Sequence, residues 1–176
     1  FIREGSEIVL LENNTYNIKN TPSEIKKIAK IIKCDVTNQL EVKKSFVEII
    51  RTYGGVNILV SNAGAAWQGE IGKVPEKVIK DSFDLNFYAH QYLSQESIKI
   101  MLKQNTGGIL LYNISKQSVN PGINFGPYGL PKASTLFLMR QYALEYGQYG
   151  IRANGINADR IRSGILNDKL ISSRAR

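Results

Sequence analysis

Two side chains four residues apart, Tyr128 and Lys132, could together carry out proton transfer. They stand at the start of an expected helix, where positions i and i+4 share one face. A free tyrosine has a pKa of about 10 and is a poor acid or base at neutral pH. A cation about 4 Å from the phenol, at an effective dielectric of about 20, contributes roughly 4 kcal/mol and could lower that pKa by up to about three units. Such a tyrosine could exchange a proton with an alcohol or a carbonyl. An unrelated surface pair is the alternative, since this spacing is a weak signal alone.

Two further polar residues, Ser115 and Asn86, could act with this pair. Ser115 lies thirteen residues before Tyr128, just past an expected strand, where its hydroxyl could hold a substrate oxygen beside the phenol. A serine bonded to local backbone is the alternative, and Ser118 is a competing hydroxyl. Asn86 falls inside an expected long helix, where asparagine is unfavourable because it competes for backbone hydrogen bonds. A buried amide needs partners. Asn86 is therefore expected to hold a water or a backbone group near the site, or else to cap a kink.

Small or polar residues end three of the expected strands. Asn62-Ala63-Gly64 follows an apolar run, and ligands of doubly wound folds bind outside the carboxyl ends of the strands. Small residues there let the backbone approach a ligand closely, although a plain turn is the alternative. Glu12 ends an earlier strand and could accept hydrogen bonds from an adenosine ribose, which favours NAD because an acid repels a 2′-phosphate. Asp35-Val36 ends the next strand and could meet the adenine.

The elements that must position these residues are alternating strands and helices. Short, continuous apolar runs are typical of strands buried on both faces of a parallel sheet. The expected strands are residues 8–11, 31–36, 56–60, 109–114 and 151–157, and the expected helices are residues 21–30, 37–53, 77–103 and 128–146. This alternation predicts an α/β fold, a Rossmann-like doubly wound parallel sheet with helices on both faces. No repeat or linker interrupts it, so residues 1–176 are expected to form a single domain.

The composition narrows the function classes. The 176 residues are 43% apolar. No apolar run approaches the roughly 20 residues that span a bilayer, so no membrane partner is expected. The net charge of +8 is spread without a basic helix face, which argues against a nucleic-acid partner. The single Cys34 allows no internal disulfide and favours a reducing cytoplasm. No residues have metal-ligand spacing, and the single His90 is expected on a helix flank.

The order of these pieces resembles the short-chain dehydrogenase/reductase family over nearly the whole chain. In that family the Asn-Ala-Gly segment, here Asn62-Ala63-Gly64, stabilises the sheet beside the cofactor. The resemblance implies a catalytic tetrad of Asn86, Ser115, Tyr128 and Lys132. It implies hydride transfer between NAD and a secondary alcohol or carbonyl. Tyr128 would be the acid/base, and Lys132 would lower its pKa and hold the cofactor ribose. Ser115 would position the substrate oxygen, and Asn86 would support a proton-relay water. A homodimer or homotetramer through the two long helices is also implied.

A narrower resemblance is to the dehydrogenase part of bifunctional rhamnulose-1-phosphate aldolase/alcohol dehydrogenases. It rests on residues 113–122, 125–128 and 157–164. It implies a small hydroxyaldehyde or a sugar-derived alcohol as substrate, and an aldolase domain in the full-length protein. Most short-chain dehydrogenases have Pro-Gly where this chain has Ala158-Asp159. By the family pattern, Ile161 and Ser163 would flank the cofactor just beyond that point.

One part of the family pattern, the phosphate-binding loop Thr-Gly-x-x-x-Gly-x-Gly, is absent. It belongs before Phe1, after a first strand that lies between the strands ending at Glu12 and Val60. The chain also stops at Arg176 within an expected helix. We therefore expect a fragment of a longer reading frame, with an incomplete sheet that lacks its first strand and its pyrophosphate cradle. The 176 residues alone are expected to bind NAD poorly.

A second function class stays open, namely a non-catalytic dinucleotide-binding or regulatory domain of the same fold. The intact set of Ser115, Tyr128 and Lys132 speaks against it. A full-length protein that reduces no NAD with any alcohol would favour it. An epimerase-type relative also uses the Tyr-x-x-x-Lys pair, but Asn62-Ala63-Gly64 and the short length argue against that interpretation.

Overall fold

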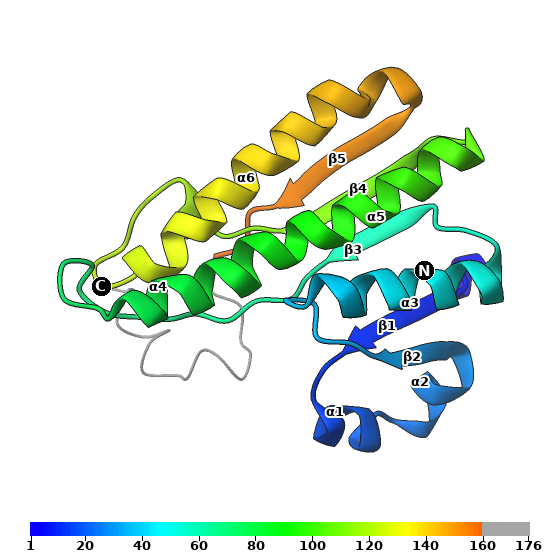
Figure 1. Ribbon diagram of the computed structural model, residues 1–176, viewed down its shortest axis with the longest axis horizontal. Coiled ribbons are helices and arrows are strands. Elements are labelled where there is room, and N and C mark those ends of the chain that lie inside the picture. Colours follow the sequence, from blue (N-terminus) through cyan, green and yellow to red (C-terminus); the bar gives the residue numbers. More distant parts are fainter. Residues whose placement is uncertain (160–176) are drawn as a thin grey trace.

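The computed structural model describes residues 1–159 and consists of parallel strands flanked by helices (Figure 1). The strands are β1 (Ile8–Glu12), β2 (Ala29–Lys33), β3 (Ile58–Ser61), β4 (Gly108–Asn113) and β5 (Ile151–Ile156). β1 pairs with β2, and β4 lies between β3 and β5. All three pairings are parallel, with Leu10 opposite Ile31 and Leu110 opposite Ala153. The expected Rossmann-like α/β fold is confirmed.

The helices connect consecutive strands. They are α1 (Thr15–Asn20), α2 (Ser23–Ile28), α3 (Gln39–Tyr53), α4 (Glu76–Phe83), α5 (Ala89–Gln104) and α6 (Gly126–Tyr146), with a π-helical turn η2 (Asp84–Tyr88) and the 3-10 turns η1 (Ile2–Glu4), η3 (Lys116–Ser118) and η4 (Gly147–Tyr149). In Figure 1, α3, α5 and α6 run side by side in front of the strands. The long helix expected over residues 77–103 is therefore two helices joined by a π-turn that contains Asn86.

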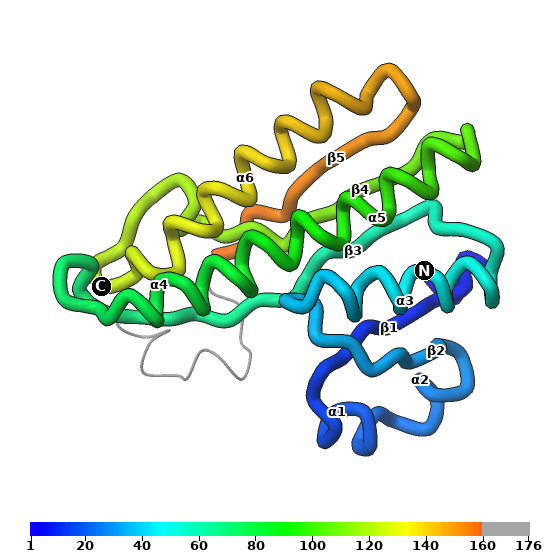
Figure 2. Tube along the Cα trace, in the orientation of Figure 1, coloured from blue at the N-terminus to red at the C-terminus, as the bar shows by residue number. Residues whose placement is uncertain are grey.

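The sheet is split, because within residues 1–159 no strand connects β1 to β3. α3 spans the division (Figure 2), and its Phe46 belongs to an apolar cluster that includes Ile32 of β2 and contacts Leu59 of β3. Ile58 and Val60 of β3 remain exposed, although strands of this fold are normally covered on both faces. The sequence analysis expected a sheet without its first strand; the described residues form two separate parallel sheets, and the missing strand itself stays a prediction.

The boundaries near β2 differ from those expected. The strand expected over residues 31–36 begins at Ala29 and ends at Lys33, and the helix expected over residues 21–30 is only α2. Ala29 already has extended backbone angles, and the Asp35 carboxylate binds the backbone N–H of Thr37, which turns the chain after the strand. The sequence analysis missed α1, which begins where Asn14 accepts hydrogen bonds from the N–H groups of the first turn.

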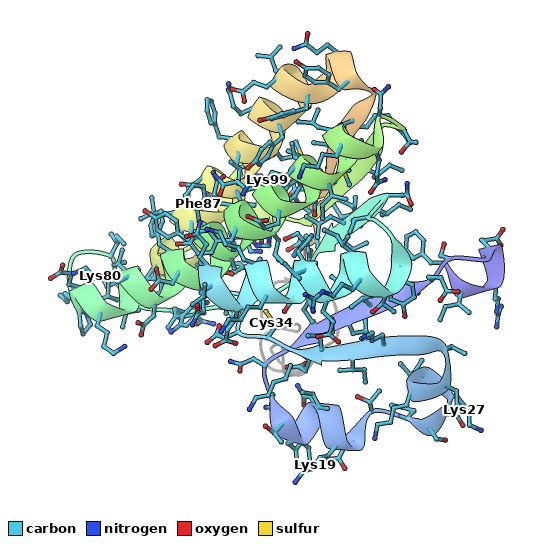
Figure 3. The ribbon with its side chains drawn as sticks, turned by 45° about the vertical axis from the view of Figure 1, so that its right-hand side comes forward. Lys19, Lys27, Cys34, Lys80, Phe87 and Lys99 are labelled. Carbon is cyan, nitrogen blue, oxygen red and sulfur yellow. The ribbon has the colours of Figure 1, made fainter. Side chains whose placement is uncertain are left out.

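The best-packed part of the molecule lies between β4, β5 and the helices α5 and α6. Its central side chains are Met101, Leu110, Tyr112 and Ile151, all almost completely buried. Figure 3 shows Cys34 beneath α3 and Lys19, Lys27, Lys80 and Lys99 on four different helices. None of the described helices is long and apolar enough to cross a membrane.

Candidate active site

Tyr128 and Lys132 occupy the first two turns of α6 and do meet. The Lys132 Nζ lies 5.8 Å from the centroid of the Tyr128 ring. Lys132 is only 2% exposed, and its ammonium donates a hydrogen bond of 2.8 Å to the carbonyl of Asn113 at the end of β4. Burial penalises the charged form and lowers the pKa of Lys132 to about 8. Lysine side chains are rarely buried, and groups with strongly shifted pKa values concentrate at functional sites. Lys132 is therefore a candidate functional group.

The pKa of Tyr128 does not follow the expectation from the sequence. Burial raises it above the ordinary value, and hydrogen bonding to the Ser115 side chain lowers it in part. The net shift of the Tyr128 pKa is therefore upward, opposite to the net depression that the sequence analysis expected. Removal of the phenol from water outweighs the stabilisation of the tyrosinate by the Lys132 ammonium, which lies at the face of the ring and donates to the Asn113 carbonyl.

Ser115 bonds to local backbone and also lies beside Tyr128, while its proposed contact with a substrate oxygen stays a prediction. It is nearly buried, it bonds to Tyr128, and its Oγ also accepts a 3.2 Å hydrogen bond from the N–H of Gln117 as the cap of η3. The competing Ser118 hydroxyl is buried, and no protein group described in residues 1–159 bonds to it. Ser115 is therefore the serine that the fold places beside the phenol.

Asn86 lies fully buried in the π-turn η2, and its amide binds the loop that follows β3. Its Nδ2 donates to the Ala65 carbonyl at 2.9 Å and to the Ser82 Oγ at 3.1 Å, while its Oδ1 accepts from the Ala65 N–H at 3.3 Å. Its backbone carbonyl accepts a 2.6 Å hydrogen bond from the Thr135 hydroxyl. The side chain holds a backbone group near the site, as one of the two sequence-based interpretations expected.

Gly64 joins these residues into one site. A Cβ at this position would lie 2.9 Å from Asn86 Oδ1 and 3.4 Å from Lys132 Nζ, so only glycine fits without displacing one of them. Asn62, two residues earlier, accepts a 2.9 Å hydrogen bond from the Asn113 side chain. Gly64 therefore lies against Asn86 and Lys132, and Asn62 contacts Asn113, whose carbonyl binds Lys132.

Sequence reasoning missed Asn113, whose carbonyl binds Lys132 and whose amide binds Asn62. A polar residue that ends an apolar strand two positions before Ser115 was the available signal. His90 was expected on a helix flank, and it lies on the buried side of α5. It is fully buried, with its Nδ1 2.6 Å from the Ser61 Oγ, and burial lowers its pKa to about 3. Its neutral ring can be buried because the imidazole shares a hydrogen bond with the end of β3.

The proposed cofactor residues of the first sheet lie at its carboxyl edge. The Glu12 carboxylate accepts hydrogen bonds from the Asn14 N–H at 2.7 Å and the Asn17 Nδ2 at 3.2 Å. Asp35 binds the Thr37 N–H and hydroxyl, and Val36 follows it, partly exposed. The two edge positions are adjacent in space, since the Cys34 N–H donates to the Glu12 carbonyl. Ile161 and Ser163 lie outside the described residues.

The residues present fit the nicotinamide ribose of a dinucleotide better than its pyrophosphate. The Lys132 ammonium has three donors, of which one binds Asn113, and it borders a glycine with no room for a side chain. This arrangement suits a nicotinamide ribose beside Tyr128. The sequence offers no glycine-rich loop for the pyrophosphate. Within residues 1–159, no group of three or more histidine, cysteine or acidic side chains could hold a metal ion.

Comparison with known proteins gives a consistent result. The family model "short chain dehydrogenase" matches residues 1–171. YuxG of Bacillus subtilis (strain 168), described as an uncharacterized oxidoreductase, is 30% identical over 169 residues, which cover 93% of this chain and 24% of YuxG. The 7alpha-hydroxysteroid dehydrogenase of Escherichia coli (strain K12) is 29% identical over 159 residues, covering 89% of this chain and 62% of that protein. The ligand-free structure of aldohexose dehydrogenase from Thermoplasma acidophilum aligns with a TM-score of 0.83 and 25% identity, over 93% of this chain and 60% of that one. The chain thus spans between about a quarter and three fifths of the length of these relatives.

Proposed function

Because this chain belongs to the short-chain dehydrogenase family, we propose that it carries the catalytic centre of a nicotinamide-dependent oxidoreductase that interconverts a secondary alcohol and its carbonyl. The observation that carries the proposal is the buried ammonium of Lys132 beneath the Tyr128 ring, next to Gly64. Burying a lysine is unfavourable for folding, and groups with strongly shifted pKa values concentrate at functional sites, which supports a functional role for Lys132.

The proposed roles follow from position and charge. A bound nicotinamide supplies the hydride donor or acceptor. In carbonyl reduction, the Tyr128 phenol donates its proton to the substrate oxygen. Burial raises the pKa of the phenol, so it is protonated before the reaction. In alcohol oxidation the same oxygen takes the hydroxyl proton, and the nearby Lys132 cation favours the anionic tyrosine. The Ser115 hydroxyl holds the substrate oxygen beside Tyr128. Asn86 supports the site through its bonds to Ala65, and a proton-relay water beside it remains part of the proposal.

For the cofactor, the family supports a nicotinamide dinucleotide, and we propose NAD in preference to NADP. Glu12 supports this choice, since a carboxylate at the end of β1 would repel a 2′-phosphate. Asp35 and Val36 would meet the adenine, while Ile161 and Ser163 would flank the nicotinamide. The split between β1 and β3 predicts that the isolated 176-residue chain binds NAD poorly. Calorimetric titration with NAD tests this prediction, and an affinity in the micromolar range would contradict it.

For the substrate, we propose a small hydroxyaldehyde or a sugar-derived alcohol. The similarity to aldohexose dehydrogenase supports a sugar-like substrate, although the hydroxysteroid dehydrogenase is a comparably similar relative. We also propose that the full-length protein contains an aldolase domain. The resemblance to bifunctional aldolase/dehydrogenases supports this, as does the low share of YuxG that the chain covers, 24%, which leaves room for other domains in that relative.

We further propose that the protein acts in the cytoplasm as a homodimer or homotetramer through α5 and α6. Leu130, Phe137 and Leu144 recur every seven residues along α6 and are 49%, 67% and 78% exposed. Residues seven apart share one helix face, and an apolar face of this kind suits contact with a second copy. Light scattering would test the assembly, and a monomer at all concentrations would contradict it.

The experiment that tests the proposed function is an assay of the intact protein with NAD and NADP across hydroxysteroids, sugar alcohols, aldoses and small 1,2-diols. We expect reduction of NAD with at least one small polyhydroxylated substrate. Turnover with the steroids alone would contradict the proposed substrate class. Tight NAD binding without turnover on any alcohol would instead favour a non-catalytic dinucleotide-binding domain.

A further inference from the structure

One buried hydroxyl on α6 bonds to the π-turn rather than to its own helix. The Thr135 Oγ1 donates to the Asn86 carbonyl at 2.6 Å, and both residues are 0% exposed. In the π-turn the hydrogen-bond spacing changes, since the N–H of Ala89 donates to the carbonyl of Asp84. π-turns of this kind are rare and are frequent at functional sites. Thr135 donates to a carbonyl of this turn from another helix, α6.

The neighbouring Ser134 shows how a hydroxyl on α6 is ordinarily satisfied. Its Oγ donates to the Leu130 carbonyl four residues back, at 3.2 Å, on the exposed side of the helix. That bond is the usual local solution for serine and threonine in helices. Thr135 instead lies three residues after Lys132 on the buried side, so that both side chains leave α6 in similar directions.

The contacts of Thr135 close a ring that begins and ends on α6. The hydroxyl holds the backbone of Asn86, and the Asn86 amide binds Ala65 on both its N–H and its carbonyl. Gly64, which precedes Ala65, lies against both Asn86 Oδ1 and Lys132 Nζ. Lys132 itself lies on α6, one turn before Thr135, so this series of contacts ends on the helix where it began. A movement of the π-turn away from α6 would therefore loosen the packing around the Lys132 ammonium.

On the premise of the proposed function, we propose that Thr135 is a positioning residue for the reaction. Its hydroxyl fixes the Asn86 turn against α6 and thereby keeps the Lys132 ammonium beneath the Tyr128 ring. Thr135 contacts neither the substrate nor the cofactor in this proposal. Thr135→Val keeps the shape of the side chain but removes the donor, and Thr135→Ser keeps the donor.

The test measures kcat, KM and the pH profile of kcat/KM for the intact protein and three variants. For Thr135→Val we expect kcat to fall about tenfold with a nearly unchanged KM, because misplacing a group that acts in the transition state lowers rate more than binding. We expect the apparent pKa of the acid/base group to rise, since a displaced cation supports the tyrosinate less. Thr135→Ser should restore both values, and Ser134→Ala should match the wild type.

The shift in pKa can be assigned to the Tyr128–Lys132 pair. His90 on α5 is a basic group that interacts with Lys132, and burial, which lowers its pKa to about 3, keeps it neutral. Tyr112 on β4 stays neutral because burial raises its pKa. A purely structural loss of stability would lower the amount of folded protein but would not move the pH profile.

Amide hydrogen exchange across residues 84–92 gives a second measurement that needs no turnover. We expect faster exchange there in Thr135→Val and wild-type exchange in Ser134→Ala. If Thr135→Val matches Ser134→Ala in both kinetics and exchange, the inference is overturned. If the wild type turns over no substrate, the proposed function fails, and exchange alone then decides whether Thr135 holds the turn.

Discussion

The two sheets of this molecule differ in how completely they are built. The second sheet, β3 to β5 with α4 to α6, encloses fully buried residues such as Leu110 and Tyr112. The first sheet, β1 and β2 with α1 and α2, has only Ala29 and Ile32 buried among its strand residues, and α1 and α2 bury none. The proposed catalytic residues all lie in the second region, whereas Glu12 and Asp35 lie in the first.

This difference indicates that the two regions have separate roles in the proposed function. Asn86, His90, Lys132 and Thr135 are polar groups buried in the second region, and their burial opposes folding unless they are bonded. A densely packed region can supply the apolar burial that offsets this penalty. The first region buries few apolar side chains. Within residues 1–159, β1 also lacks a hydrogen-bonded neighbour on one side. We therefore expect the proposed proton-transfer site to be preformed and the adenosine end to be looser.

The largest change in the free energy of unfolding and in turnover should come from removing the buried charge of Lys132. Lys132 has a pKa of about 8 in the folded protein against 10.5 ordinarily, a difference that corresponds to about 3 kcal/mol. Because the folded pKa is the lower one, the penalty is complete below pH 8, declines as the pH rises to 10.5 and is absent above it. Lys132→Met should raise the free energy of unfolding at pH 7 by up to about 3 kcal/mol while abolishing turnover.

Denaturant titration at pH 7 and pH 10.5 would measure this effect, and the advantage of Lys132→Met should shrink at the higher pH. Lys103→Met, at an exposed position near the end of α5, is the control and should have little effect. A less stable Lys132→Met at neutral pH would show that the buried lysine stabilises the fold, and it would undermine the contrast between the regions.

A smaller effect is expected from filling the space at Gly64. Gly64→Ala would force its Cβ against Asn86 Oδ1 and Lys132 Nζ. Overpacking of this kind costs about 1–3 kcal/mol of stability, and displacing a catalytic group can lower kcat about a hundredfold. Gly72→Ala is a matched control, since nothing lies within 4 Å of its Cβ. Thermal unfolding and kcat would be measured, and equal behaviour of the two variants would refute a preformed site.

The buried His90 predicts acid sensitivity located in the second region. Its folded pKa of about 3 is below the ordinary 6.5, so the unfolded chain binds the proton first and stability falls as the pH drops below 6.5. Between pH 6.5 and pH 5 the loss should be about 2 kcal/mol. Because His90 is the only histidine, His90→Phe should remove most of this slope in urea unfolding. An unchanged slope would mean that other groups cause the acid sensitivity.

The smallest change in the free energy of unfolding should come from breaking an ion pair of the first region. Lys30 of β2 pairs with Glu48 of α3 at 2.8 Å, but both side chains are partly exposed. Such pairs contribute about 0.2–1 kcal/mol, and salt screens them. Glu48→Gln should therefore lower the unfolding free energy by less than about 1 kcal/mol, with a smaller difference in high salt. A loss comparable to that of Gly64→Ala would show that the first region is more tightly coupled than its packing indicates.

The sequence predicted the second region better than the first. Short, continuous apolar runs and the Tyr-x-x-x-Lys spacing located β4, α6 and the meeting of Ser115, Tyr128 and Lys132. Element boundaries near β2 were shifted because short helices such as α1 depend on a single cap, Asn14. The positions of His90 and Thr135 depend on contacts between distant segments, and helical periodicity carries no information on those. The pKa of Tyr128 was misjudged because burial depends on the assembled fold.

The most direct test of the account is turnover by Tyr128→Phe in the intact protein, with Tyr149→Phe, an exposed tyrosine in η4, as control. Losing a general acid/base is expected to lower kcat by about 10²–10⁴-fold. NAD affinity and the free energy of unfolding should change little, and Tyr149→Phe should behave like the wild type. A Tyr128→Phe variant with near wild-type kcat would contradict the assignment of Tyr128 as the proton-transfer residue.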